Sequence, residues 1–365
     1  MLSVLPKTEG VLEEEHGRGH HLGAQVYVRL GEETIVDEGW GENRPGVPIS
    51  PDDISLWLSA TKPVVAIAFA QLVERGVVDL DVPVAQIIPE FAQSGKDRIT
   101  FHHVLTHTGG FRKADVSWDD DSWEDILAVI CRTPPESDWR PGEKAGYHVA
   151  TGWYVLGESI QRLTDRSLPE ILRSKIFDPL GMDDSWLGIP PASYHSYGDR
   201  ISPSYDATRN LEPHTFFNSE EGAAVVRPGG NGRGPVRDLG RLYAALLGGG
   251  SLDGQRILKP DTVSRFISRQ RTGLYDHTFR HQMDWGFGFI LNSARYDEAR
   301  VPYGYGPHAS QETFGHSGWQ SACAFADPEH QLVVAWVCNG TPGEPRHHRR
   351  QRALNRAIYE DLGIA

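Results

Sequence analysis

The sequence is poor in cysteine, which argues against a scaffold held together by disulfides. Only three cysteines occur among 365 residues, none of them in a C-x-x-C pair, and their number is odd. We therefore expect Cys131, Cys323 and Cys338 to be small, buried apolar residues in a reducing compartment.

An excess of basic residues is also lacking. Lysine and arginine number 36 against 49 acidic residues, which gives a net charge of −13. Nucleic acids and anionic membranes repel such a protein, so we expect neither as a partner. The one basic stretch, RHHRRQR at 346–352, is interpreted as the solvated face of a C-terminal helix.

Long apolar runs are absent as well. The best candidate, Pro63 to Val73, is far shorter than the roughly 20 residues that span a bilayer. The N-terminal segment shows no basic region followed by an apolar one, so no secretory signal is expected. Both observations favour a cytoplasmic protein.

Metal and phosphate signatures are missing too. The cluster His102, His103 and His107 lacks a ligand spacing such as H-E-x-x-H. The glycine-rich stretch GGNGRG (229–234) lacks the G-K-[ST] ending of a phosphate-binding loop. We therefore expect no metal ion and no cofactor.

Strand patterns occur near both ends of the chain and helical patterns between them. Residues 23–40 predict a hairpin, 285–291 a strand, and 321–340 a strand, turn and strand. A helix at 59–75 is followed by further helical candidates at 122–132, 148–164, 167–176, 236–248 and 259–268, and a last one at 346–361. This order predicts a discontinuous α/β sheet domain (1–60 and 280–365) and a mainly helical domain (61–279).

The pattern S-x-x-K occurs once, at the start of the first of these helices. Ser59 and Lys62 stand one helical turn apart, so hydroxyl and ammonium share one face. Unpaired N–H groups at a helix start favour negative charge developing at the serine. A lysine can act as a base there only if burial lowers its pKa from about 10.4.

A second serine lies in FGHSGWQS (314–321), which looks like a nucleophile elbow. The elbow G-x-S-x-G needs glycine two residues after the serine, but Trp319 follows Ser317 at that spacing. Ser317 is therefore not the expected nucleophile.

Several segments together resemble the serine β-lactamase and penicillin-binding-protein superfamily. The branch that they resemble is that of class C β-lactamases and the related family VIII carboxylesterases. The similar segments follow the family's order over roughly residues 20–340: ISLWLSATKPVVAIAFAQLVERGVVDLDVPVAQIIPEF, ITFHHVLTHTGGF, RPGEKAGYHVATGWYVLGESIQRLT, RDLGRLYAALLGGGSLDGQRIL, and FGHSG followed by AFADPEHQLVVAWVCNG.

The resemblance implies a β-lactamase-like fold with the active site in the cleft between the two domains, and an acyl-enzyme mechanism. Ser59 would attack a carbonyl, and Lys62 with Tyr147 would remove its proton and pass it to the leaving group. The backbone N–H groups of Ser59 and Trp319 would form the oxyanion hole.

The segment His316-Ser317-Gly318 would form the substrate-side strand, where the family usually has Lys-Thr/Ser-Gly. Imidazole has a pKa near 6.5, so a permanent positive charge for a substrate carboxylate is not assured. Val149 stands two residues after the tyrosine, where penicillin-processing members carry Asn. Arg233 is a further candidate for facing a substrate carboxylate. The histidine at position 316 and the valine at position 149 both count against efficient β-lactam turnover.

The sequence therefore predicts a serine hydrolase or acyltransferase for a small ester or amide, most simply of carboxylesterase type. A D-amino-acid amidase or peptidase and a weak β-lactamase are the enzymatic alternatives. A non-catalytic ligand-binding relative is the alternative from another class, and the presence of Ser59, Lys62 and Tyr147 argues against it.

Overall fold

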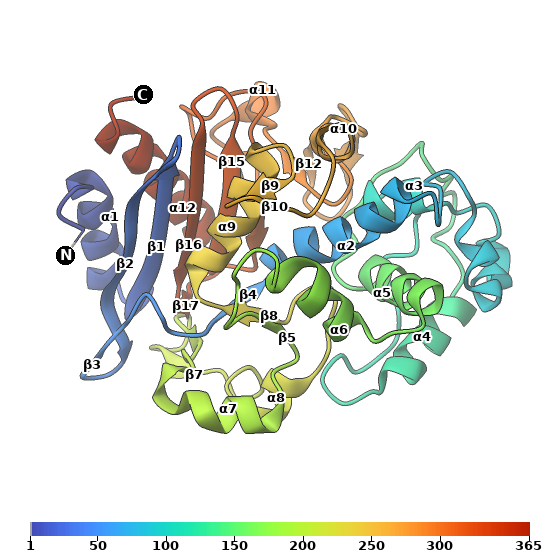
Figure 1. The fold of residues 1–365 in the computed structure, drawn as a ribbon, viewed down its shortest axis with the longest axis horizontal. Helices are drawn as coiled ribbons and strands as arrows, with labels where there is room; N and C mark the ends of the chain where they lie inside the picture. Colours follow the sequence, from blue (N-terminus) through green and yellow to red (C-terminus); the bar gives the residue numbers. More distant parts are fainter. Residues whose placement is uncertain (1) are drawn as a thin grey trace.

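A seven-stranded antiparallel sheet built from both ends of the chain organises the computed structural model, which describes residues 2–365 (Figure 1). This confirms the predicted fold class. Its strands run in the order β13-β14-β15-β16-β1-β2-β3. Their bounds are β1 Gly23–Leu30, β2 Glu33–Arg44, β3 Val47–Pro48, β13 Ile290–Leu291, β14 Phe314–Gly318, β15 Ala322–Asp327 and β16 Leu332–Cys338.

Helices cover both faces of this sheet because its central strands are apolar on both sides. In β16 every residue is buried. Its even-numbered side chains pack with α1 (Pro6–Gly17) and α12 (Glu344–Asp361), and its odd-numbered ones pack with α9 (Val236–Leu247). Figure 1 shows α9 in front of the strands. A strand buried on both faces needs no polar alternation, and LVVAWVC has none.

The basic stretch of α12 is not simply a solvated face. His347 and Arg350 are buried. The Arg350 guanidinium donates to the carbonyl oxygens of His20 (3.2 Å), Gln320 (2.8 Å) and Gly340 (3.1 Å). Arg350 therefore ties α12 to the turn before β1 and to the end of β14, which corrects the sequence interpretation. Five hydrogen-bond donors in a rigid fork make arginine suited to such a position.

The remaining helices lie mostly to one side of the sheet, at the right of Figure 1. They are α2 Lys62–Glu74, α3 Phe101–Leu105, α4 Trp123–Arg132, α5 Thr151–Thr164, α6 Leu168–Leu172, α7 Pro191–Tyr197, α8 Glu220–Ala224, α10 Pro260–Ile267 and α11 Ala294–Asp297. Short strands join them: β4 Ser55–Leu58, β5 Trp186–Leu187, β6 Tyr205–Asp206, β7 Glu212–Pro213, β8 Gly232–Gly234, β9 Ser251–Leu252, β10 Gln255–Arg256, β11 Tyr275–Asp276, β12 His281–Gln282 and β17 Gly340–Thr341.

Two sequence expectations need adjustment. Only Ile290–Leu291 of the stretch 285–291 forms a strand, because a turn closed by the Gly286 N–H on the Phe289 carbonyl (3.0 Å) precedes it. Helix α9, assigned from the sequence to the helical part, packs against β1, β15 and β16. The division into 1–60 with 280–365 and 61–279 otherwise remains a prediction.

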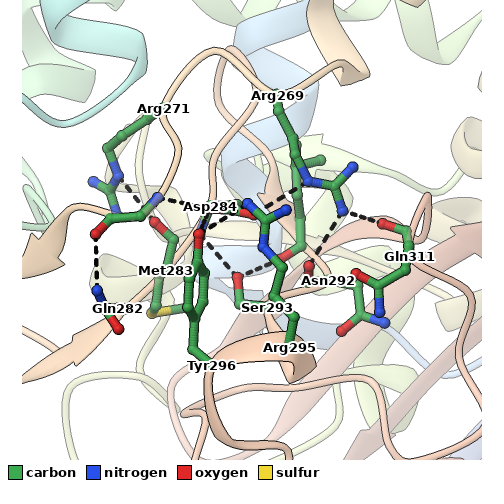
Figure 2. A network of polar contacts seen from close by, with 12 residues as sticks. Arg269, Arg271, Gln282, Met283, Asp284, Asn292, Ser293, Arg295, Tyr296 and Gln311 are labelled. Carbon is green, nitrogen blue, oxygen red and sulfur yellow. Dashed lines mark hydrogen bonds and ion pairs between the residues drawn. The ribbon is translucent and has the colours of Figure 1, made fainter.

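A buried carboxylate fixes the segments that lead towards β13. Asp284 is fully buried and contacts Arg269 (3.1 Å), Arg295 (2.6 Å) and the Tyr296 hydroxyl (2.9 Å) (Figure 2). Two cations and a hydroxyl offset the cost of removing this carboxylate from water. The loop between α10 and β13 is thereby held in a defined position.

Cys131, Cys323 and Cys338 are buried free thiols, which confirms the predicted burial, while the reducing compartment stays a prediction. Within residues 2–365, none of the helices combines the length and apolar character needed to cross a membrane.

Candidate active site

Ser59 stands at a sharp junction between β4 and α2. The preceding residue, Leu58, has φ +50°, which is an uncommon and costly conformation for a bulky side chain. A 3-10 turn, Ser59–Thr61, then leads directly into α2. The junction places Ser59 at a helix start, as the S-x-x-K spacing predicted, where backbone N–H groups lack helical partners.

Lys62 lies fully buried behind this serine. Its Nζ donates to Ser59 Oγ at 2.9 Å and also to the carbonyl oxygen of Gly229. Burial lowers the Lys62 pKa well below its ordinary value near 10.5. A neutral amine in contact with the hydroxyl can accept its proton, which is the property that a base in this position requires.

Gly229 is a site residue that sequence reasoning missed. The stretch GGNGRG was considered only as a phosphate-binding loop, and that interpretation was rejected. A Cβ on Gly229 would lie 3.1 Å from the Val149 oxygen and 3.2 Å from Lys62 Nζ. A side chain at position 229 would therefore crowd both atoms, and glycine lets this carbonyl approach the lysine without displacing them.

Tyr147 completes the polar group at Ser59. Its ring centroid is 5.2 Å from Lys62 Nζ, and its hydroxyl is hydrogen-bonded with the Ser59 side chain. Burial raises the Tyr147 pKa above its ordinary value, and the charges of Asp276 and Glu344 raise it further, whereas the bond with Ser59 lowers it. The phenol is therefore protonated at neutral pH, and it can pass a proton on rather than act as a phenolate.

The backbone of Tyr147 is fixed by Asp276, a second residue that sequence reasoning missed. Asp276 is fully buried and accepts the Tyr147 N–H at 3.0 Å through Oδ1. Arg271 donates to Oδ2 at 3.0 Å and to the Thr106 carbonyl at 3.0 Å. Because Asp276 is far from Tyr147 in the sequence, no local pattern pointed to this contact.

Strand β14 and the residue after it form the opposite wall. The described structure has a cavity of about 520 Å³ whose lining includes Ser59, Tyr147, His316, Ser317 and Trp319. The structure brings these predicted site residues together, with Lys62 directly behind the serine.

Gly318 allows β14 to approach Ser59. A Cβ at this position would lie 2.2 Å from the Trp57 carbonyl oxygen and 3.1 Å from Leu58 Cβ. Real Cβ atoms do not come so close, so any larger residue would push β14 away from β4. The glycine predicted from the family triplet therefore sets the width of the site.

His316 is neutral in this environment. Its Nδ1 lies 2.8 Å from the Ser317 carbonyl oxygen, so Nδ1 carries the proton and Nε2 keeps its lone pair. Burial first, and then the charge of Lys62, lower the His316 pKa to about 3. The position where the family usually has lysine thus provides no fixed positive charge.

Arg233 is the predicted site residue that the structure does not bring to the cavity. It lies on β8 with 1% of its surface exposed and is not among the cavity-lining residues within 2–365. Its guanidinium donates to the Phe217 carbonyl (2.7 Å) and to Asn231 Oδ1 (3.3 Å). Because β8 pairs with β4, Arg233 supports the strand that leads to Ser59.

Two buried histidines pack behind Tyr147. The His107 ring lies 4.9 Å from the Tyr147 ring, and its Nδ1 accepts the His148 N–H at 3.2 Å. His148 Nε2 accepts the Phe111 N–H at 3.2 Å. Burial lowers the pKa of both, that of His148 to about 3. No group of three metal-ligating side chains occurs within the described chain.

These histidines predict a loss of stability in mild acid. His148 and His316 have pKa values of about 3 in the folded protein but titrate near 6.5 when unfolded. The unfolded chain therefore binds more protons, and the free energy of unfolding falls as pH drops below 6.5. Each histidine contributes about 1.4 kcal/mol per pH unit. Burial raises the pKa of Asp238 to about 7, so this carboxyl binds a proton in the folded protein first. Its contribution to the free energy of unfolding therefore rises as the pH falls and offsets that of one histidine.

Urea unfolding between pH 7 and pH 4.5 measures this dependence. We expect a net fall of at least about 1.4 kcal/mol per pH unit. The Asp238→Asn variant should show a steeper fall, because it removes the opposing carboxyl. A free energy of unfolding that stays constant from pH 7 to pH 5 would contradict the assignment of neutral buried histidines.

Comparison with known proteins decides the family. The sequence profile of the Beta-lactamase family matches residues 9–358. The chain belongs to the beta-lactamase family. Among its curated relatives, this beta-lactamase-family protein is 27% identical over 400 residues to esterase EstB of Burkholderia gladioli, covering 98% of this chain and 95% of the relative.

The chain is also similar to a second curated esterase and to a solved structure. Esterase/beta-lactamase LipL of Mycobacterium tuberculosis is 26% identical over 347 residues, covering 87% of this chain and 77% of the relative. The crystal structure of a family VIII carboxylesterase superposes with a TM-score of 0.80 at 27% identity and covers 97% of both chains. This beta-lactamase-family protein is thus a serine-hydrolase relative, as its sequence motifs implied.

Proposed function

We propose that the protein is a carboxylesterase-type serine hydrolase that forms an acyl-enzyme on Ser59 from a small ester. The observation that carries the proposal is the 2.9 Å contact between Lys62 Nζ and Ser59 Oγ, at the wall of an open cavity. A buried lysine with a lowered pKa is the activating group that a serine nucleophile needs.

The proposed steps follow from the positions of these groups. Ser59 Oγ attacks the ester carbonyl carbon while its proton moves to Lys62 Nζ, and the carbonyl oxygen becomes an oxyanion. The N–H groups of Ser59 and Trp319 stabilise this charge. Collapse breaks the bond to the alkoxy oxygen, which takes the proton through the Tyr147 hydroxyl. Water then attacks the acyl-enzyme by the same route in reverse, releasing the acid and Ser59.

Two features favour a neutral ester over a β-lactam. Val149 lines the cavity with 58% of its surface exposed and supplies no amide to a substrate. His316 is neutral and offers no fixed charge to the carboxylate that penicillins and cephalosporins carry. The name of EstB points to esterase activity in a similar protein, whereas the name of LipL includes both esterase and beta-lactamase activity.

Turnover of a matched panel tests the proposal: p-nitrophenyl acetate and butyrate, a D-amino-acid p-nitroanilide, and a chromogenic cephalosporin. We expect kcat/KM for the butyrate to exceed the values for the amide and the cephalosporin by at least tenfold. A fluorophosphonate should add its phosphonyl mass at Ser59 in the intact protein. A faster amide or cephalosporin reaction would reject the esterase proposal, and failure to label Ser59 would favour a non-catalytic binder.

A further inference from the structure

One ionised carboxylate faces the catalytic cavity, and nothing in the proposed reaction uses it. Glu344, the first residue of α12, lines the cavity together with the rings of Phe279, Tyr303 and Trp319. Trp319 has 42% of its surface exposed. Aromatic faces around a negative charge form an environment that attracts an organic cation.

The Glu344 carboxylate is held in place from several sides. The Tyr303 hydroxyl lies 2.8 Å from its oxygens, and His348 Nε2 lies 3.1 Å from Oε2. The neighbouring Gly343 N–H donates to Gln320 Oε1 at 2.6 Å. Burial raises the Glu344 pKa, but the bonds from His348 and Tyr303 outweigh it, so the net pKa is lowered and the group is charged at neutral pH.

The backbone around this carboxylate is strained. Tyr303 has φ +55° and Gln320 has φ +51°, a conformation that residues other than glycine rarely adopt. Both residues help to position Glu344 or the residue before it. Strained residues of this kind tend to cluster where a ligand is held.

Of the basic side chains at the cavity, His348 is the one that contacts Glu344 within residues 2–365. Lys62 is buried behind Ser59 and engaged with Gly229, and His316 is neutral. Arg280 is exposed where it lines the cavity, and it makes no ion pair within residues 2–365. His348, which contacts Glu344, lines the same wall.

We propose that Glu344 selects substrates that carry an alkylated ammonium group, which would lie between this carboxylate and the surrounding aromatic rings. An alkylated ammonium costs less to remove from water than a primary one, and a cavity of about 520 Å³ has room for it beside an ester. The proposal rests on the proposed function, since the group would belong to the ester that Ser59 attacks.

Two pairs of isosteric esters test the charge preference at either end of the substrate. On the alcohol side, butyrylcholine is compared with 3,3-dimethylbutyl butyrate. On the acyl side, p-nitrophenyl 4-(trimethylammonio)butyrate is compared with p-nitrophenyl 5,5-dimethylhexanoate. We expect the cationic ester of at least one pair to have a kcat/KM about five- to thirtyfold higher, and Glu344→Gln to abolish that ratio.

A control variant separates a local effect from a change in net charge. Glu329→Gln removes one negative charge from the exposed turn between β15 and β16, and Glu329 is not among the cavity-lining residues within 2–365. It should keep the cationic preference unchanged. Equal kcat/KM within both pairs, or a preference that survives in Glu344→Gln, overturns the proposal. A preference for p-nitrophenyl hemiglutarate over both kinds of ester overturns it as well and assigns Arg280 to a substrate carboxylate.

Binding without turnover distinguishes the two proposals from each other. Calorimetric titration with benzyltrimethylammonium at pH 8 should give at least about fivefold weaker binding to Glu344→Gln than to the wild type. If no ester is hydrolysed but this difference is found, the hydrolase proposal fails and the ammonium site stands. If esters are hydrolysed without charge preference and the affinity does not depend on Glu344, only the ammonium site fails.

Discussion

Replacing Ser59 by alanine is expected to lower kcat/KM for p-nitrophenyl butyrate by about 10⁴-fold or more. The hydroxyl is the atom that would form the acyl bond, and Lys62 Nζ at 2.9 Å has no other hydroxyl of this kind to activate. The side chain is small and lies at the cavity wall, so its loss leaves no large void. Stopped-flow and steady-state ester assays measure the loss of activity. Thermal unfolding followed by circular dichroism should show an unchanged Tm.

Ser317 provides the matched control, because it is the serine that imitates a nucleophile elbow. Ser317 lines the same cavity, but its hydroxyl is buried and has no nitrogen or oxygen hydrogen-bond partner within residues 2–365, so we expect Ser317→Ala to cost at most about tenfold. Wild-type activity in Ser59→Ala, or an equal loss in both variants, would reject Ser59 as the nucleophile.

Replacing Lys62 by methionine is expected to lower kcat/KM by about 10³-fold while leaving the Tm unchanged or higher. The loss follows from removing the only amine in contact with Ser59 Oγ within the described chain. Stability is kept or gained because methionine fills the same space without a buried amine to remove from water, and this outweighs the single carbonyl, that of Gly229, that loses its donor. Ester kinetics and thermal unfolding of the same preparation measure both effects.

Lys96 provides a control, because its replacement should lower stability and leave activity unchanged. It is also fully buried, but its Nζ donates to three carbonyl oxygens, those of Gln93 (3.1 Å), Cys131 (2.8 Å) and Thr133. Lys96→Met leaves these acceptors unpaired, so we expect about 2 kcal/mol or more of destabilisation with kcat/KM of the folded protein retained. If Lys62→Met lost stability and kept activity instead, the assignment of Lys62 as the base would be wrong.

Local patterns were sufficient to predict the centre of the site. The spacing of Ser59 and Lys62 at a helix start, and the collinear family segments around Tyr147 and His316, indicated which residues would meet. The structure brings them to one cavity. The strands at both chain ends, with their different apolar periodicity, similarly indicated a single antiparallel sheet.

Contacts made over long sequence distances were not predictable in this way. The Gly229 carbonyl, the Asp276 carboxylate and the Glu344 carboxylate reach the site from a loop, the short strand β11 and a helix start, and none of these carries a recognisable motif. The same limit applies to Arg233, since only the packing of β8 shows that its guanidinium is buried away from the cavity. Helix α9 has the period of any amphipathic helix, and nothing in it specifies the sheet as its partner.

The close approach of Gly318 to Trp57 has a consequence for how the protein acquires activity during synthesis. The segment with Ser59 and Lys62 emerges early from the ribosome, whereas β14 follows only near the end of the chain. Strand β1 likewise cannot pair with β16, its neighbour in the sheet, until β16 has been synthesised. Pairings of such high contact order form late and slowly. A nascent chain therefore carries the proposed nucleophile and base for most of translation without the strand that forms the opposite wall of the cavity.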